Sequence, residues 1–231
     1  VSTSNARCGR CGNNCLLTIS KFSDGSRYIT GNRCERGAGV TTKKSDLPNL
    51  YKIKQKLLFD RPVLSEEEAK RGVIGIPRVL NMYENYPFWH TLFTELKFHV
   101  QLSPASTKGI YEKGMETISS DTACYPAKLV HGHIKWLVEQ DVKYIFYPAL
   151  NYERKEDESA PNHYNCPIVA TYPEVIANNM DEILADNDVH FAHPFLPYDN
   201  DLRLADALVK EFERFHITKD EIIQAVAAAR R

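Results

Sequence analysis

Short apolar runs that alternate with helical patterns constrain the fold most strongly. The first run, Val73 to Ile76, is wholly apolar, and others follow at 99–102, 144–147 and 189–191. Runs of this length are typical of strands buried in a parallel sheet. Helical periodicity lies between them, over 88–98, 110–115, 126–138 and 173–179. The alternation predicts an α/β domain over residues 72–231, a doubly wound, Rossmann-like parallel sheet with right-handed crossovers.

Amphipathic patterns within 201–231 predict two further helices that pack on this domain, with Thr218 and Glu221 as a capping box. Ligands of such sheets gather beyond the carboxyl ends of the strands. Candidate functional residues are therefore expected in the loops that leave those ends.

Cys124 stands directly before the helix that is easiest to predict. Pro126 suits a first-turn position, and Asp121 and Thr122 can supply a cap. At a helix N-terminus the free amides and the dipole favour the thiolate, which is the form that attacks electrophiles and binds metals. The opposite interpretation is a buried, inert cysteine, which is common for a lone thiol.

Two potential cations follow Cys124 in the same helix. Lys128 and His131 are expected on a flank that adjoins Cys124 and lies clear of the buried face, where they add positive charge near the sulfur. We therefore include both with Cys124 as candidate cofactor-binding residues.

Cys166 is the second candidate partner of Cys124. It is also followed by a proline, and it ends the long polar loop 151–165. If 168–171 is a parallel strand, Cys166 starts that strand at the edge opposite Cys124. If 166–171 is instead an irregular loop before a helix at Pro173, both thiols lie at one rim. The loop itself is either a cover over the site or disordered.

Four further cysteines predict a small metal-stapled module over residues 1–45. The spacing is C-x2-C-x3-C-x18-C, and the segment has too few apolar residues to fold by burial alone. Zinc is favoured, because the long hairpin-like gap before the last ligand is typical of zinc ribbons, while a 4Fe-4S cluster is the rival. Two disulfides are disfavoured in a chain with no export signal. The four ligands are Cys8, Cys11, Cys15 and Cys34.

Residues 46–71 are charged and are expected to form a linker. The formal net charge of −1, with acidic and basic residues interspersed, disfavours nucleic-acid and membrane partners. No apolar run approaches the ~20 residues of a membrane helix, and no secretory signal opens the chain, so a cytoplasmic location is expected. No phosphate-binding motif of the G-x-x-x-x-G-K-[ST] type occurs, so we expect no ATP hydrolysis by this chain alone.

Several long motifs together resemble a known family. They are G-N-N-C-L-L-T-I, G-N-R-C-E-R-G, I-G-I-P-R-V-L-N-M-Y-E-N-Y-P-F-W, D-T-A-C-Y-P-A-K-L-V-H-G-H and N-C-P-I-V-A-T-Y-P-E-V-I. Over nearly all of residues 8–215 the chain resembles the acyl-CoA dehydratase activase-related proteins. In these large chains, an activase of the 2-hydroxyglutaryl-CoA dehydratase type is joined to a dehydratase-component-like region.

The resemblance implies low-potential electron transfer. In related systems an activase hydrolyses ATP and passes one electron to an iron-sulfur cluster held by cysteines, in support of reductive chemistry on an acyl-CoA. Cys124 and Cys166 would then be ligands of a 4Fe-4S cluster, with a further ligand from outside this chain and an activase as partner. The alternative is a non-catalytic, metal-binding scaffold that docks the activase. A third possibility is a thiol enzyme with Cys124 as nucleophile.

Overall fold

The computed structural model describes residues 1–40 and 47–231, which form two compact units. The first unit comprises Val1–Leu50 with Thr107–Gly109, and the second comprises Tyr51–Ser106 and Ile110–Arg231. The predicted boundary between residues 45 and 46 lies outside the described residues. The segment predicted as a linker contains helix α1 (Leu50–Phe59), which has no buried residue.

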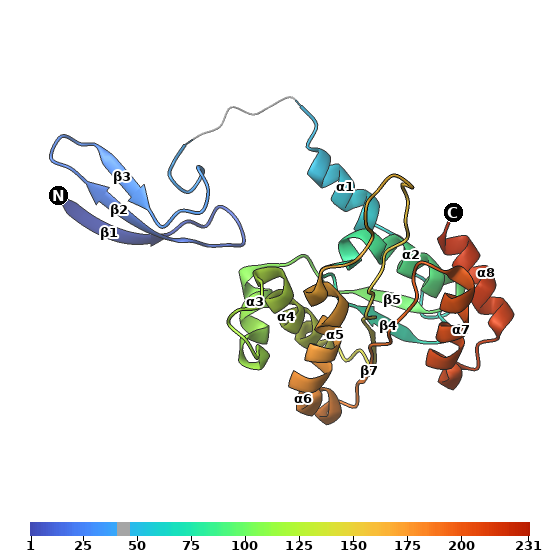
Figure 1. Ribbon diagram of the computed structural model, residues 1–231. Helices are drawn as coiled ribbons and strands as arrows, with labels where there is room; N and C mark the ends of the chain where they lie inside the picture. The colour runs from blue at the N-terminus through green and yellow to red at the C-terminus, as the bar shows by residue number, and fades with distance from the viewer. Residues whose placement is uncertain (41–46) are drawn as a thin grey trace. The chain divides into compact units, whose positions relative to one another are not determined.

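The N-terminal unit is a three-stranded antiparallel sheet in the order β1-β2-β3 (Figure 1). Its strands are β1 (Ser2–Arg7), β2 (Leu16–Lys21) and β3 (Arg27–Thr30). Every residue of β1 is exposed, and among the described residues of this unit Leu17 is the one apolar side chain that is buried. Apolar burial therefore contributes little to holding this unit together.

The second unit is built on a four-stranded, wholly parallel sheet in the order β5-β4-β6-β7. The strands are β4 (Val73–Ile76), β5 (His99–Leu102), β6 (Tyr144–Phe146) and β7 (His190–Ala192). All four coincide within a residue or two with the apolar runs of the sequence. The predicted parallel α/β sheet is thereby confirmed.

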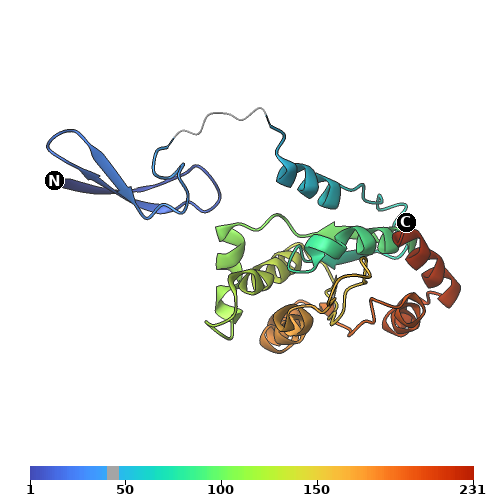
Figure 2. The same cartoon turned by 45° about the horizontal axis from the view of Figure 1, so that its top comes forward.

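Helices cover both faces of the parallel sheet. Figure 1 shows α4 and α5 on one side and α2, α7 and α8 on the other, and Figure 2 shows the same layers from another direction. None of the helices in the described part of the chain is long and apolar enough to cross a membrane. The helices are α2 (Met82–Glu95), α3 (Lys108–Gly114), α4 (Tyr125–Glu139), α5 (Pro167–Asn179), α6 (Asp181–Asp186), α7 (Asp201–Glu211) and α8 (Lys219–Ala229), with 3-10 turns η1 (Met115–Thr117) and η2 (Glu213–Phe215).

Two helices begin six residues earlier than the sequence pattern predicts. Helix α2 starts at Met82 rather than Phe88 and contains Pro87, and α5 starts at Pro167 rather than Pro173, which lies inside it. An internal proline normally ends or kinks a helix because it lacks the amide donor, so the pattern gave the wrong start in both cases. Consequently 166–171 is neither the strand nor the irregular loop considered above, and Cys166 directly precedes a helix.

Aromatic packing fixes α2 and α7 against the sheet. The rings of Trp89 and Phe93 each lie 5.0 Å from the ring of Phe146 in β6, and Phe212 after α7 lies 5.7 Å from Phe93 and 5.9 Å from Phe146. All four side chains are fully buried. Aromatic pairs contribute through area and through edge-to-face geometry, so this cluster is the centre of the core.

Two glycines let α3 and α4 approach closely. A Cβ on Gly132 would lie 1.7 Å from the carbonyl oxygen of Ile110, and a Cβ on Gly114 would lie 2.3 Å from the amide nitrogen of Gly132. Both obstacles are backbone atoms, which cannot rotate away. The position of α3 beside α4, and hence the course of the chain towards Cys124, requires glycine at both positions.

We expect the substitution Gly132→Ala to lower the free energy of unfolding by about 2 kcal/mol or more, because α3 and α4 must separate. Chemical denaturation measures the change. Gly109→Ala is the matched control, since a Cβ there would meet only the Thr107 Oγ1 at 3.7 Å, and it should change stability by less than about 1 kcal/mol. Equal stability of the two variants would contradict the close approach.

Candidate functional site

The two cysteines of the parallel-sheet unit occupy equivalent positions. Cys124 is the N-cap residue of α4 and Cys166 is the N-cap residue of α5, each followed by a proline in the first turn. Both thiols are free and exposed. Because α4 and α5 each lead into the next parallel strand, their N-termini lie at the carboxyl edge of the sheet, where ligands of such sheets bind. The interpretation of Cys124 as a buried cysteine is therefore wrong.

Helices α4 and α5 also lie side by side on one face of the sheet (Figures 1 and 2). The Cys124 thiol is close enough to Tyr172 on α5 to interact with it electrostatically. Burial, followed by this interaction with Cys124, raises the pKa of the Tyr172 hydroxyl. The fold therefore brings Cys124 to the first turns of the helix that Cys166 begins.

The N-terminus of α4 differs from the predicted cap. Cys124 itself is the N-cap, with an extended backbone, and no side chain caps the helix, so the expectation that Asp121 and Thr122 supply the cap is wrong. Lys128 reaches back towards this turn, where its Nζ donates to the Asp121 carbonyl oxygen at 2.7 Å. The ammonium group is thus held beside the segment that carries Cys124.

His131 was expected to lie clear of the buried face of α4, and this expectation is wrong, because the side chain is fully buried. Its Nδ1 lies 2.8 Å from the Thr117 Oγ1, and its Nε2 lies 3.1 Å from the Tyr172 hydroxyl. Burial lowers the pKa of His131 to about 4. At neutral pH the ring is therefore uncharged, and it acts as a neutral link between α4, α5 and the turn before them.

The neighbouring His133 is also fully buried, on a different side of α4. Its two ring nitrogens lie within 2.8 and 2.9 Å of the hydroxyls of Ser103 and Ser106. Burial, followed by the nearby charge of Arg78, lowers the pKa of His133 to about 4. Both histidines of the H-G-H motif thus serve packing as neutral hydrogen-bonding groups.

The two ends of the loop before Cys166 are hydrogen-bonded to each other. An antiparallel bridge joins Tyr152 to Tyr164, and the Glu153 amide donates to the His163 carbonyl oxygen at 2.8 Å. At the base, the Asn165 amide donates to the Asn151 carbonyl oxygen at 2.9 Å. These bonds hold the end of the loop to its start, which fixes Cys166 at the carboxyl edge of β6.

A cavity at this edge was not predicted from the sequence. It has a volume of about 870 Å³ and lies between the N-terminus of α2 and the loop after β6. Its polar lining includes Asn81, Asn85, Glu153 and Asn165. The available signal was their position in the segments that follow the predicted strands at 73–76 and 144–147, where ligands of such sheets bind.

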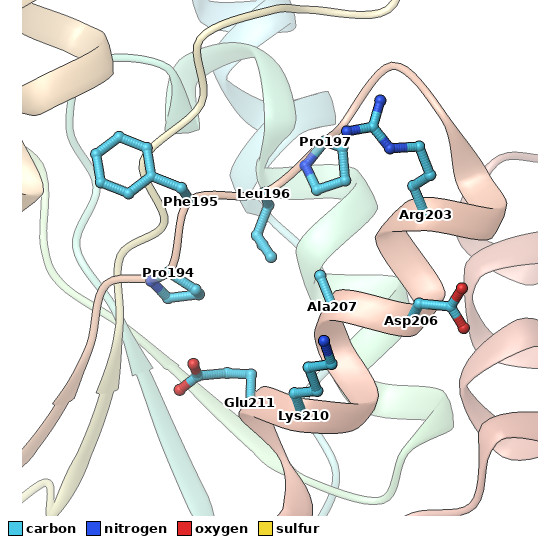
Figure 3. A pocket seen from close by; sticks show the side chains of 9 residues that line it. All are labelled: Pro194, Phe195, Leu196, Pro197, Arg203, Asp206, Ala207, Lys210 and Glu211. Atoms are coloured by element: carbon cyan, nitrogen blue, oxygen red, sulfur yellow. The ribbon is translucent and has the colours of Figure 1, made fainter.

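A second hollow of about 490 Å³ lies between the loop after β7 and α7 (Figure 3). Pro194, Leu196 and Ala207 form its apolar wall (Figure 3). The carboxylate of Glu211 accepts from the Tyr144 hydroxyl, and the carboxylate of Asp206 is paired with Lys219. Both carboxylates of this hollow are therefore already bonded within the fold.

The four N-terminal cysteines lie around the ends of the small sheet. The Cys8 amide donates to the Cys15 carbonyl oxygen at 2.9 Å, which closes the hairpin formed by β1 and β2. The Gly37 amide, above all, lowers the pKa of the Cys34 thiol, as expected of a turn that offers amides to a metal-bound sulfur. In the described ranges, no group of three or more cysteine, histidine or carboxylate side chains is assembled at metal-binding distance. The four thiols are ligands of the type that zinc prefers. The structure does not show the predicted metal site.

The two buried histidines predict a specific pH dependence. In the unfolded chain a histidine takes up its proton near pH 6.5, whereas folded His131 and His133 do so only near pH 4. The free energy of unfolding should therefore fall as pH drops from about 6.5 to about 4, by roughly 2 to 3 kcal/mol for each histidine. Denaturation at several pH values measures the slope, which His131→Gln should make shallower. A slope unchanged by this substitution would contradict a buried neutral ring.

Comparison with known proteins places the parallel-sheet unit in a family. No curated protein and no solved structure matches the chain significantly. The family model described as the CoA enzyme activase uncharacterised domain (DUF2229) matches residues 73–231. These residues cover the parallel sheet, helices α4 and α5, and the C-terminal helices α7 and α8. The chain therefore belongs to the CoA enzyme activase-related family.

Proposed function

We propose that this domain is the electron-transfer region of an ATP-dependent activase system related to the acyl-CoA dehydratases. Its task is to receive a low-potential electron from an ATP-hydrolysing activase, as a partner subunit or another domain, for reductive chemistry on an acyl-CoA or a similar substrate. Membership of the CoA enzyme activase-related family supports the assignment to such an activase system. The observation that carries the electron-transfer role is the placement of Cys124 and Cys166.

The chemistry of these two thiols and their places in the fold support the proposed iron-sulfur cluster. Both are exposed, and both begin adjacent helices that start at the carboxyl edge of the sheet. The order β5-β4-β6-β7 supports the Rossmann-like assignment, in which this edge is the ligand-binding edge. A 4Fe-4S cluster bound there would supply one-electron chemistry at low potential.

The residues around the thiols would act on a cluster through charge and hydrogen bonding. The free amides at the two helix N-termini and the ammonium of Lys128 oppose negative charge. His131, being neutral, does not add charge; it fixes α4 to α5 through Tyr172 and so sets the spacing of the two thiols. A 4Fe-4S cluster needs more ligands than these two cysteines. We propose that a different subunit, or another part of a longer protein, supplies the remaining ligands.

A non-catalytic scaffold is the second candidate. It is favoured by the finding that no group of three potential ligands is assembled in the described ranges. In that case the domain docks the activase, and the exposed thiols bind no cluster.

Anaerobic reconstitution with iron and sulfide in the full-length protein, with the activase present, distinguishes the two candidates. We expect a cluster whose visible charge-transfer absorbance and electron paramagnetic resonance signal are lost in Cys124→Ser and in Cys166→Ser, because each substitution removes a thiolate ligand. Iron content measured on the same samples gives the stoichiometry.

Cys8→Ser is the matched control, because it changes a thiol of the N-terminal unit and should leave this signal in place. Retention of the full signal by both the Cys124 and the Cys166 variants would refute the electron-transfer proposal and favour the scaffold.

The N-terminal unit is proposed to bind one zinc ion through Cys8, Cys11, Cys15 and Cys34, with a 4Fe-4S cluster as the alternative. Its sheet has one buried apolar side chain among the described residues, so a metal would supply the missing stability, about 10 kcal/mol or more for a structural zinc site. The amide donors at Cys34 support thiolate ligation there.

Metal analysis of the purified protein tests this unit. We expect about one equivalent of zinc per chain, which Cys34→Ser should remove together with the slow amide hydrogen exchange of β2. Cys124→Ser should leave both unchanged. Iron with sulfide in place of zinc would select the cluster, and a metal-free, exchange-protected unit would reject both.

A further inference from the structure

A third hollow, of about 430 Å³, lies between α1 and the segment that follows β4. Strand β4 is an inner strand of the sheet, with β5 on one side and β6 on the other. The segment after β4 therefore leaves the carboxyl edge, where open α/β sheets bind their ligands, and the volume lies within the ~300–1,000 Å³ range of small-molecule sites. The lining residues are Lys52, Gln55, Lys56, Phe59, Asp60 and Arg78.

Positive charge dominates this hollow. Three of its six lining side chains are cations, and one, that of Asp60, is a carboxylate. In the other two hollows described above, the carboxylates equal or outnumber the cations. The excess of positive charge on this part of the surface attracts an anion.

Arg78, two residues after β4, is the cation best placed to bind an anion. Its guanidinium carbon lies 3.8 Å from the centre of the Phe59 ring, a stacked contact that orients the planar group. Its backbone amide donates to the Ser103 Oγ at 2.7 Å, which fixes the chain at this point. The side-chain Nε is buried without a hydrogen-bond partner, and no carboxylate in the described part of the chain forms an ion pair with the guanidinium. A ligand would therefore meet the two terminal Nη groups, which nothing in the fold neutralises.

Helix α1 divides its lysines between two tasks. Lys52 and Lys56 are one helical turn apart and both line the hollow, on the same side of α1 as Phe59. Lys54 does not line the hollow; its ammonium pairs with Glu84 on α2 at 3.3 Å and so holds α1 to the domain. The charge of the hollow is therefore a property of two particular lysines and not of the whole helix.

We propose that this hollow binds the phosphate group of a small molecule. The Nη groups of Arg78 donate two hydrogen bonds to phosphate oxygens, the ammonium of Lys56 donates another, and Lys52 adds positive charge. Three cations and one carboxylate leave an excess of two positive charges, which matches a phosphate ester of charge about −1.5 to −2 at pH 7.

The phosphate group has two possible sources, inorganic phosphate and an organic phosphate ester. The acyl-CoA of the proposed function is an ester of this kind, so the organic source rests on that function. Phosphate binding itself needs neither a cluster nor an activase, and its success or failure is independent of electron transfer.

Nuclear magnetic resonance titration of the protein, without added iron, sulfide or activase, tests the proposal. Inorganic phosphate tests the free anion, and adenosine 3′,5′-bisphosphate tests the organic ester. Adenosine, which lacks phosphate, and sodium chloride at equal ionic strength are the controls. We expect saturable shifts of amides in 52–60 and 78–80 with at least one phosphate probe and none with the controls. Binding of the bisphosphate about tenfold tighter than that of phosphate would select the organic source, and equal binding would select the free anion.

Variants separate the roles of the cations. Arg78→Lys should weaken phosphate binding by about tenfold or more, because it keeps the charge but loses the paired hydrogen bonds. Lys56→Gln, on the exposed surface of α1, should weaken binding by about two- to fivefold without lowering the melting temperature. Lys54→Gln is the matched control, since it removes the same charge from the same helix outside the hollow, and it should bind as the wild type does.

Four results would overturn the proposal. The first is the absence of saturable shifts with both phosphate probes up to about 10 mM, a concentration that detects even weak sites. The second is equal affinity for adenosine and its bisphosphate, which would mean that the phosphate is not recognised. The third is unchanged binding in both Arg78→Lys and Lys56→Gln. The fourth is an equal loss in Lys54→Gln and Lys56→Gln, which would assign the binding to the general charge of α1.

Discussion

Burial of the parallel sheet on both faces is the constraint on which the rest of the structure depends. Strands β4 and β6 have almost no exposed side chains, so helices must cover them from two sides. The aromatic cluster around Phe146 closes one face, and α4 with α5 closes the other. With both faces covered, the loops at the carboxyl edge of the sheet are where polar side chains can meet a ligand. The N-termini of α4 and α5 lie at this edge, as does the cavity between α2 and the loop after β6.

Neutral hydrogen-bonding groups set the geometry of the candidate cysteine site. Buried His131 on α4 joins the turn at Thr117 to Tyr172 on α5, and Gly114 and Gly132 let α3 pack closely against α4. This arrangement places the N-termini of α4 and α5 at one edge without burying the thiols. A site built in this way can present two sulfurs to a shared partner while the supporting residues stay inside the domain.

The candidate cysteine site and the cavity between α2 and the loop after β6 share one structural support. Glu153 is held by amides from α2 and from the end of the loop after β6, and that loop ends directly before Cys166. The Glu153 carboxylate therefore anchors the residue directly before Cys166. The N-terminal unit is different in kind, because its small sheet buries little apolar surface and depends on its cysteines for any further stabilisation.

The sequence by itself determined the strands, the parallel class of the sheet and the position of Cys124 before a helix, because apolar runs and helical periodicity are local signals. It also carried the family resemblance, which the match over residues 73–231 confirms. Only the tertiary structure decided that α2 and α5 continue through Pro87 and Pro173, since packing outweighs the lost amide bond. It also decided that His131 is buried and neutral and that Asn81 has no partner. Burial and pairing depend on residues distant in sequence, and no local pattern records them.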